Sequence, residues 1–213
     1  MDGNKRWSKR NNKNQFDSYL NGANKLIKIS NYIFKNYKVN YISAFALSKY
    51  NLKRSNALIN TLNNVFKHFL DKDPNDFNYN FRIIFKGDKS FLSPYLLKKI
   101  IKLESHNIDC KKKLFIFINY SGQEDIINTF RNLSLNKFKV NKKNFKNSLI
   151  TNDTPDPDLL IRTGGYQRIS DFMLYQLSFT ELFFTKILWP DLNYKNIDNF
   201  ISKFKKIERK FGL

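Results

Sequence analysis

The residues Asp158-Leu-Leu-Ile-Arg-Thr-Gly-Gly-Tyr-Gln-Arg-Ile-Ser-Asp-Phe172 decide the expected fold of this 213-residue chain. Within them, 159–161 is an apolar run of the length of a buried strand, and the glycine pair 164–165 allows a tight turn. Ser170 is a good N-cap for a helix over residues 170–179. The stretch therefore predicts a strand, a turn and a helix in immediate succession.

Two arginines, Arg162 and Arg168, flank that predicted turn. Their guanidinium groups match the geometry of phosphate oxygens, and the free N–H groups at a helix start favour the same anion. From spacing alone, the alternative is a pair of surface arginines near a loop. The arrangement favours a diphosphate-binding corner.

A second block, Met1-Asp2-Gly3-Asn4-Lys5-Arg6-Trp7, stands at the start of the chain. Asp2 could hold Mg²⁺, which normally bridges a carboxylate to substrate phosphates, and Gly3 would let backbone N–H groups approach them. Asp-Gly-Asn is also ordinary turn chemistry. The block alone leaves both interpretations open.

Together the two blocks, with Glu181 and Trp189-Pro-Asp191, resemble the cis-prenyltransferases, and most closely the undecaprenyl diphosphate synthases of that family. Nearly the whole chain takes part in the resemblance. The other segments that carry it, in the expected order, are 45–54, 82–84 with 87–88, 119–122 and 208–212.

The resemblance implies an α/β fold in one domain over residues 1–213, with a central, mostly parallel sheet flanked by helices. It implies condensation of isopentenyl diphosphate onto an allylic diphosphate such as farnesyl diphosphate, with cis double bonds and Mg²⁺ as cofactor. The product would be an undecaprenyl-like diphosphate lipid carrier, and the enzyme would work as a homodimer.

Residue by residue, the resemblance implies catalytic roles for Asp2 and Asn4, and a metal held by Asp2 with Glu181. Gly3, Asn4, Arg6 and Arg54 would cradle the allylic diphosphate, while Arg162, Arg168 and Ser170 would hold isopentenyl diphosphate. The full substrate-binding set is Gly3, Asn4, Lys5, Arg6, Trp7, Ser48, Asn51, Arg54, Arg162, Arg168 and Ser170.

The growing product would need an apolar tunnel. Candidate lining residues are Leu58, Leu62, Val65, Phe66, Phe45, Leu47, Ile84 and Phe117. An ordinary hydrophobic core explains each of them equally well, so both interpretations stay open.

The chain departs from the family pattern at several charged positions, which are occupied here by Gln15, Tyr19, Tyr50, Gln123 and Tyr166. Loss of one cation at a diphosphate costs about 1.5–3 kcal/mol, which weakens a site rather than abolishing it. A second hypothesis is therefore a degenerate accessory subunit of the same fold. Retention of Asp2, Arg162 and Arg168 argues against it.

The net charge of +20 raises a third hypothesis, an RNA-binding protein. Lysines are spread along the whole chain and no stacking platform of aromatic residues is evident, so we expect no nucleic-acid partner. The charge would attract a diphosphate and an anionic membrane face, which makes peripheral membrane contact an expectation. The single Cys110 favours a reducing cytoplasm, and no apolar run approaches the length of a membrane span.

Hydrophobic periodicity predicts alternating helices and strands, as in an α/β sheet covered on both sides. Expected strands are 39–45, 81–85, 114–118 and 159–161. Expected helices are 26–34, 58–70, 92–103, 125–133, 170–179 and 197–210, with a polar, lysine-rich segment at 136–152.

The start of the chain also differs from the family pattern, in which a buried strand precedes the Asp-Gly-Asn turn. Here Asp2 directly follows Met1, which favours a gene start placed one strand late. Because a chain terminus frays unless something holds it, we expect Asp2 to be held poorly.

Overall fold

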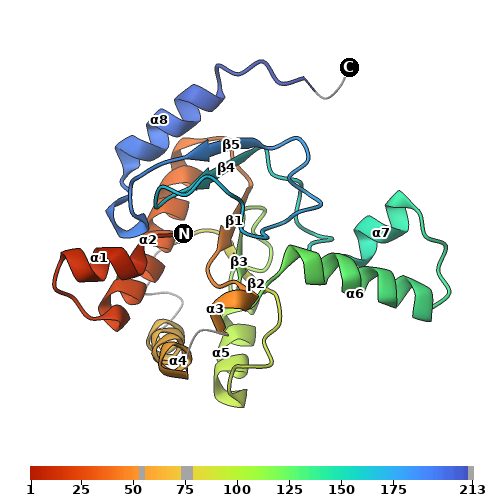
Figure 1. Ribbon diagram of the computed structural model, residues 1–213, viewed down its shortest axis with the longest axis horizontal. Coiled ribbons are helices and arrows are strands. Elements are labelled where there is room, and N and C mark those ends of the chain that lie inside the picture. The colour runs from red at the N-terminus through yellow and green to blue at the C-terminus, as the bar shows by residue number, and fades with distance from the viewer. Residues whose placement is uncertain (53–55, 73–78, 211–213) are drawn as a thin grey trace.

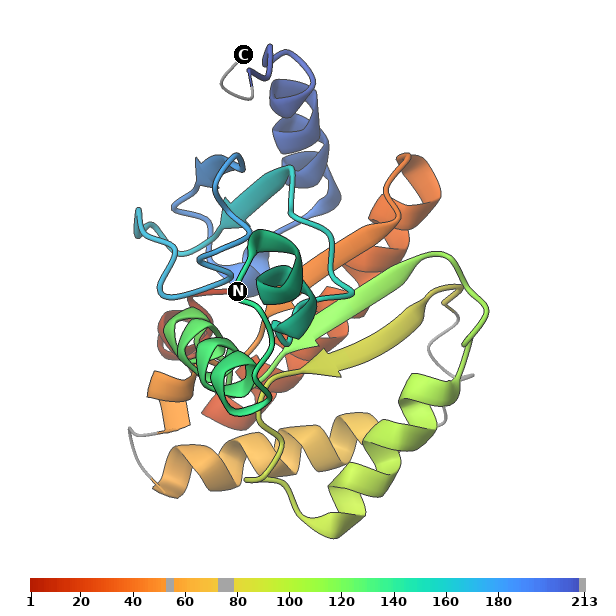
Figure 2. The ribbon, with the colours of Figure 1, turned by 90° about the vertical axis from the view of Figure 1, so that its right-hand side faces the viewer.

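A computed structural model of the chain describes residues 1–52, 56–72 and 79–210. Three strands, β1 (Tyr41–Phe45), β2 (Arg82–Lys86) and β3 (Lys113–Phe117), form a parallel sheet in the order β1-β3-β2. Two more, β4 (Leu159–Arg162) and β5 (Glu181–Phe184), form a second parallel pair. In Figures 1 and 2 this pair lies beyond β1, on the side away from β3.

Helices surround these strands (Figure 1). Their bounds are α1 (Asn4–Arg10), α2 (Gln15–Asn36), α3 (Lys49–Leu52), α4 (Asn56–Leu70), α5 (Pro94–Ser105), α6 (Gly122–Leu135), α7 (Lys142–Ser148) and α8 (Tyr194–Phe204), with a 3-10 helix η2 (Trp189–Asp191). The fold is α/β with a parallel sheet flanked by helices, as the sequence predicted.

Strand β3 is apolar on both faces because both faces are covered. Leu114 and Ile116 belong to the larger core, which includes residues of α2, α4 and α5. Phe115 and Phe117 are fully buried on the other face, where Phe172 and Met173 pack on them. Two cores therefore hold this strand in place, and its near-continuous apolar sequence is typical of parallel sheets.

Most predicted elements are present with small changes of boundary. The strand expected from residue 39 begins at Tyr41, and the helix expected to reach residue 210 ends at Phe204. The elements that were missed are α1, where the sequence suggested only a turn, the short helices α3 and η2, α7 in the lysine-rich segment, and β5. Short elements with few apolar residues give little periodic signal.

The predicted helix over residues 170–179 is wrong, because these residues form a series of turns. Ser170, Asp171 and Met173 have φ angles of 52°, 66° and 45°, in the left-handed region that a right-handed helix excludes. Phe172 and Met173 fill the smaller core instead. Their apolar pattern thus reflects core packing of an irregular segment.

The candidate tunnel residues divide between the two cores. Leu47, Leu58, Leu62 and Phe66 belong to or pack on the larger core. Phe45, Ile84 and Phe117 belong to or pack on the smaller one, and Val65 on α4 is also buried. The apolar tunnel therefore stays a prediction, and the sheet lies between the two groups of candidate residues.

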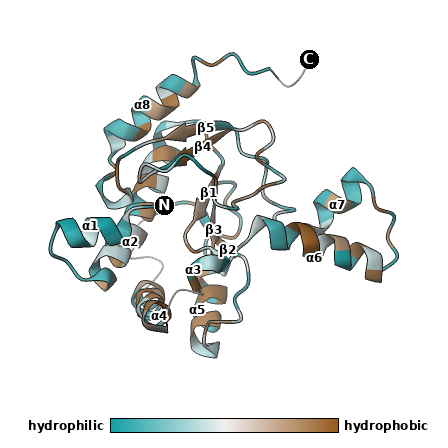
Figure 3. Cartoon of the chain, in the orientation of Figure 1, coloured by the Kyte–Doolittle hydropathy of each residue, from teal (hydrophilic) through white to brown (hydrophobic). Residues whose placement is uncertain are grey.

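Figure 3 shows hydrophobic positions on α6, which protrudes from the rest of the molecule together with α7, and several apolar side chains of α6 are exposed. Ile127 and Phe130 lie on α6 and Leu135 at its end, and Leu135 is 80% exposed. Within the described ranges, no helix combines the length and apolar character needed to cross a membrane.

Candidate diphosphate-binding site

The two sequence blocks, one at each end of the chain, meet at the carboxyl end of β4. The backbone N–H of Asp2 donates to the hydroxyl of Thr163 at 2.9 Å, and the N–H of Trp189 donates to the carbonyl of Asp2 at 2.9 Å. The Met1 amino group lies 3.5 Å from the carbonyl of Phe45, at the end of β1. The expectation that Asp2 is poorly held is therefore wrong.

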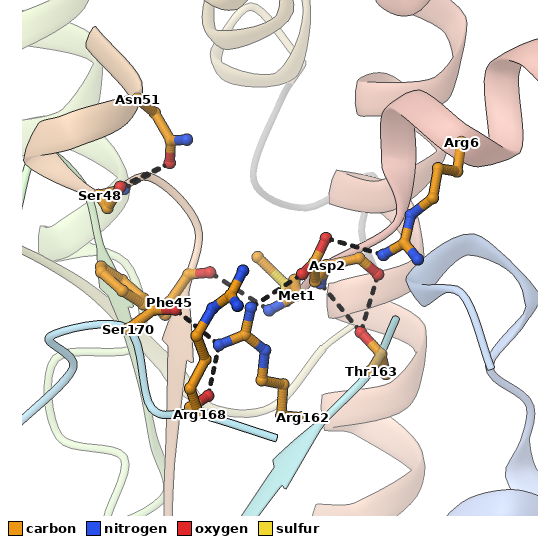
Figure 4. A network of polar contacts seen from close by, with 10 residues as sticks. All are labelled: Met1, Asp2, Arg6, Phe45, Ser48, Asn51, Arg162, Thr163, Arg168 and Ser170. Carbon is orange, nitrogen blue, oxygen red and sulfur yellow. Dashed lines mark hydrogen bonds and ion pairs between the residues drawn. The ribbon is translucent and has the colours of Figure 1, made fainter. Parts of the chain in front are cut away.

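The carboxylate of Asp2 lies between two guanidinium groups (Figure 4). Arg6 approaches it at 3.3 Å from α1, and Arg162 at 3.0 Å from the end of β4. The Asp2 side chain is 35% exposed, so a ligand can still reach it. This arrangement joins an acidic oxygen donor to two phosphate-binding cations.

Gly164 is required where these segments meet. Its φ is 89°, and a Cβ at this position would lie 2.6 Å from a guanidinium nitrogen of Arg6 and 3.0 Å from Cβ of Asp2. Its N–H donates to the carbonyl of Ile187 at 2.7 Å. Any side chain here would both strain the backbone and push the N-terminal block away from β4.

Arg162 also fixes the loop that follows β4. Its guanidinium donates to the hydroxyl of Ser170 at 2.6 Å and to the backbone carbonyl of Arg168. The Arg162 side chain is only 13% exposed, whereas that of Arg6 is 47% exposed. Ser170 thus contributes through its side-chain contact with Arg162, because there is no helix here for it to cap.

Asp171 ties this loop to the start of α6. Its carboxylate accepts from the hydroxyl of Ser121 and, at 2.9 Å, from the backbone N–H of Gln123. Its backbone carbonyl accepts from the N–H of Gly122 at 2.8 Å. The loop therefore has a fixed conformation without regular secondary structure.

Several predicted site residues point elsewhere. The indole N–H of Trp7 donates to Asp191 at 2.9 Å, which fastens α1 to η2. The side-chain oxygen of Asn4 is buried close to Gly22 of α2. Lys5 is exposed on α1, and Gly3, with a φ of 111°, begins that helix.

Ser48 and Asn51 form a separate turn after β1 (Figure 4). The hydroxyl of Ser48 donates to Asn51 at 2.8 Å, and the backbone N–H of Ser48 donates to the same oxygen at 3.0 Å. Among the described residues, the hydrogen bonds of the Ser48 and Asn51 side chains stay within this turn and do not reach the Asp2 cluster. Arg54 lies outside those residues.

Glu181 lies at the far end of the β4–β5 pair. It is in register with Leu159, whereas Arg162 is in register with Phe184. Three residues of strand span about 10 Å. The structure therefore does not bring Glu181 and Asp2 together within this chain.

The departures from the family pattern occupy different environments. Gln15 begins α2, and Tyr19 packs on the larger core. Tyr50 is half exposed on α3, and the backbone of Gln123 is bound by Asp171. Tyr166, in contrast, lies inside the arginine cluster, where its ring is contacted by guanidinium groups.

Sequence reasoning assigned no role to Thr163 or Asp171, although both hold the site together. Thr163 is 2% exposed and contacts both the N–H and the carbonyl of Asp2. Thr163 belongs to the Arg-Thr-Gly-Gly motif, and this position in the motif could have indicated its role. Nothing in the local sequence could reveal the contact of Asp171 with Ser121, because these residues are 50 positions apart.

Two other carboxylates near the strand ends have shifted pKa values. The backbone N–H of Ser90, followed by its side chain, lowers the pKa of Asp88. Burial raises the pKa of Asp125, which accepts from the hydroxyl of Tyr120 at 3.2 Å and from the N–H of Ile150 at 2.9 Å. These groups stabilise the turns next to β2 and β3.

Among the described side chains, carboxylates that could hold a divalent cation are few near the site. Within the described residues, no group of three or more His, Cys, Asp or Glu side chains is placed to hold a metal ion. Mg²⁺, however, is commonly bound by one or two carboxylates together with substrate phosphates. The partly exposed Asp2 fits that mode.

A hollow of about 410 Å³ lies at the opposite end of the sheet. It is lined by residues 34–40 and Lys112, at the amino end of β1. Its position excludes it from the cluster at Asp2, which lies at the carboxyl end of the strands.

Comparison with known proteins identifies the family. The prenyltransferase profile described as "Putative undecaprenyl diphosphate synthase" matches residues 1–212. The chain belongs to this family. Its members named as undecaprenyl and dehydrodolichyl diphosphate synthases are cis-prenyltransferases, which condense isopentenyl diphosphate onto an allylic diphosphate.

Individual relatives agree with this assignment. An isoprenyl transferase of Helicobacter pylori is 34% identical, with 100% of this chain and 94% of the relative covered. A ditrans,polycis-undecaprenyl-diphosphate synthase ((2E,6E)-farnesyl-diphosphate specific) of Legionella pneumophila is 34% identical, with 100% and 92% covered. The crystal structure of lavandulyl diphosphate synthase from Lavandula x intermedia in complex with dimethylallyl diphosphate superposes with a TM-score of 0.91 at 28% identity, covering 100% of this chain and 95% of that one.

Proposed function

We propose that this chain is an active, Mg²⁺-dependent enzyme that extends farnesyl diphosphate with isopentenyl diphosphate to an undecaprenyl-like diphosphate. The observation that carries the proposal is the meeting of Asp2, Arg6 and Arg162 at the carboxyl end of β4. An accessory subunit without activity would have no need to retain a carboxylate between two phosphate-binding cations.

The chemistry asks for positive charge at a departing diphosphate. The allylic C–O bond breaks and its electron pair leaves with the diphosphate, while the double bond of isopentenyl diphosphate forms the new C–C bond and a proton is lost. Arg6 and Arg162 stabilise anionic oxygens by charge-assisted hydrogen bonds. When bound at Asp2 and the phosphate oxygens, Mg²⁺ would add Lewis-acid stabilisation of the leaving group.

The remaining site residues divide between the allylic diphosphate and isopentenyl diphosphate. Arg168 and Ser170 belong to the isopentenyl diphosphate side, together with Arg162. Arg54, Ser48 and Asn51 remain predicted contacts of the allylic substrate. Glu181 remains a predicted metal ligand, and its register in β5 lends that role no support.

Product length is a finer part of the proposal. We assign the growing chain to the side of the sheet covered by α4, where Leu58, Leu62 and Phe66 meet the larger core. Relatives with names as different as lavandulyl and undecaprenyl diphosphate synthase are similar to this chain, so the fold alone does not set the product.

We further propose a homodimer in the cytoplasm with peripheral membrane contact. The exposed apolar side chains of α6 support an interface with a second copy. The net charge of +20 supports attraction to an anionic membrane face. Sedimentation at several protein concentrations tests the dimer, and pelleting with anionic vesicles tests the membrane contact.

The proposed reaction is tested by incorporation of radiolabelled isopentenyl diphosphate into butanol-extractable product, with farnesyl diphosphate as acceptor. We expect product that requires Mg²⁺ and that contains several added units. The absence of labelled product with the intact, folded chain, at any Mg²⁺ concentration, would favour the accessory-subunit hypothesis.

A further inference from the structure

The ring of Tyr166 is the centre of a group of three guanidinium groups. The guanidinium carbon of Arg168 lies 4.2 Å from the ring centroid, that of Arg6 at 5.2 Å and that of Arg162 at 5.7 Å. All three are within the range of a cation–π contact, about 6 Å. They come from α1, from the end of β4 and from the following loop, so the ring connects three separate parts of the site.

Three like charges this close to one point repel one another. Asp2 compensates part of this repulsion through its ion pairs with Arg6 and Arg162. Arg168 forms no ion pair within the described part of the chain, and of the three guanidinium groups it lies nearest to the Tyr166 ring. An aromatic face attracts a cation through its quadrupole while carrying no formal charge.

The residue at position 166 decides how much positive charge is left for a ligand. A carboxylate there would pair with the arginines and cancel one charge. A phenol ring gathers the same arginines and leaves three cations against the single carboxylate of Asp2. Such a site attracts a polyanion such as diphosphate more strongly, because the ring adds no second carboxylate to the ion pairs that Asp2 already forms with Arg6 and Arg162.

We propose that Tyr166 is a positioning residue that holds Arg162 and Arg168 for the diphosphate of isopentenyl diphosphate, beside Arg6 of the allylic side, without neutralising any of the three. The inference rests on the proposed function for the identity of the substrate. The role of the ring in arranging the arginines can be tested with inorganic diphosphate alone. The aromatic ring, and not the hydroxyl, is the active feature.

Three substitutions separate ring, hydroxyl and charge. Tyr166→Phe keeps the ring, Tyr166→Leu removes it, and Tyr166→Glu adds a negative charge. Because the side chain is 46% exposed, each variant is expected to fold. Tyr95→Leu is a matched control, since Tyr95 of α5 is also 46% exposed and its ring lies near Lys67 of α4 and Lys99 of α5.

The readouts are KM and kcat for isopentenyl diphosphate and, without turnover, the Kd of inorganic diphosphate measured by calorimetry. We expect Tyr166→Phe to stay within about twofold of wild type. Tyr166→Leu should raise KM and Kd about three- to tenfold with little change of kcat, as expected for loss of exposed cation–π contacts. Tyr166→Glu should raise them further, and its diphosphate binding should depend less on salt concentration.

Opposite results would overturn the inference. If Tyr166→Phe binds diphosphate as weakly as Tyr166→Leu, the hydroxyl and not the ring has the role. If Tyr166→Leu keeps the KM and Kd of wild type, the ring has no role. Equal or tighter diphosphate binding by Tyr166→Glu would contradict the charge argument. If wild type binds diphosphate in a ring-dependent way but transfers no prenyl group, the proposed function fails while the inference stands. Absence of diphosphate binding by an active wild type would overturn the inference alone.

Discussion

Two corners of this fold begin alike in sequence and end differently in structure. At one, Ser121 follows β3 and caps α6, accepting a hydrogen bond from the backbone N–H of Glu124 at 3.2 Å. At the other, Ser170 follows β4, has a φ of 52° and accepts a hydrogen bond from Arg162 instead. The first serine stabilises a helix, and the second takes part in an arginine cluster.

The difference teaches that a serine near glycines at a strand end does not by itself predict a helix start. What distinguishes the corners is the partner available in space. Arg162 and the Arg168 carbonyl lie next to Ser170, and Asp171 is held by Ser121 and Gln123. The helix corner stabilises the fold, and the arginine corner is the candidate site.

Removal of the arginine that organises the candidate site should have the largest effect. Arg162→Ala should lower kcat/KM for isopentenyl diphosphate about 100-fold, because a charge-assisted contact contributes about 1.5–3 kcal/mol. Tm should fall by a few degrees, because the loop after β4 also loses its contacts with Arg162. Steady-state kinetics and thermal unfolding measure the two effects.

The matched control is Arg131→Ala, since Arg131 is exposed on α6 and contacts only Asn128 among the described hydrogen bonds. It should keep wild-type kinetics. Equal activity losses in the two variants would show that Arg162 acts through general charge and not through its position.

Removal of the Asp171 carboxylate, which connects the two corners, should lower both stability and activity. Asp171→Ala removes the acceptor used by Ser121 and by the N–H of Gln123, and should cost about 1–3 kcal/mol of unfolding free energy. Activity should fall about tenfold as the loop after β4 loses its anchor. Urea unfolding and kinetics on the same preparation test this, and a loss of stability with full activity would contradict the proposed coupling.

Ser170→Ala tests the arginine corner alone. Loss of one hydrogen bond of about 0.5–1.5 kcal/mol should raise KM for isopentenyl diphosphate about three- to tenfold. We expect no change in Tm beyond about 2 °C, because no helix depends on this serine. A large fall in Tm would indicate that Ser170 has a structural role like that of Ser121.

Ser121→Ala should have the smallest effect on activity. Loss of an N-cap costs about 1 kcal/mol of stability, which should lower Tm by a few degrees. The activity at 25 °C should stay within about twofold of wild type. A loss of activity greater than that of Ser170→Ala would reverse the assignment of the two corners.

The sequence predicted much of this fold because its long elements carry strong periodic patterns. The strand at 114–118 is apolar on both faces and was found nearly as it stands in β3, and the helix at 125–133 lies within α6. The site was predicted as two blocks, and the structure brings these blocks into contact at Thr163 and Gly164.

The remaining features depend on tertiary contacts that no local pattern contains. The segment 170–179 has helical spacing, yet contacts of Ser170 with Arg162 and of Asp171 with Ser121 hold it in left-handed turns. Glu181 is part of the family pattern, yet strand register places it at the other end of β5 from Arg162. Trp7 contacts Asp191, which lies 184 positions away in the sequence.

Above all, we propose that the allylic diphosphate leaves at Asp2 and Arg6, next to Arg162 of the isopentenyl diphosphate side. The most direct measurement is the release of inorganic diphosphate by wild type and by Asp2→Ala, with farnesyl and isopentenyl diphosphates added separately and together. Because the backbone contacts of Asp2 with Thr163 and Trp189 remain, the variant should keep its fold. We predict Mg²⁺-dependent release by wild type only when both substrates are present, and almost none by Asp2→Ala at an unchanged Tm. Release at the wild-type rate by the folded variant would contradict the account.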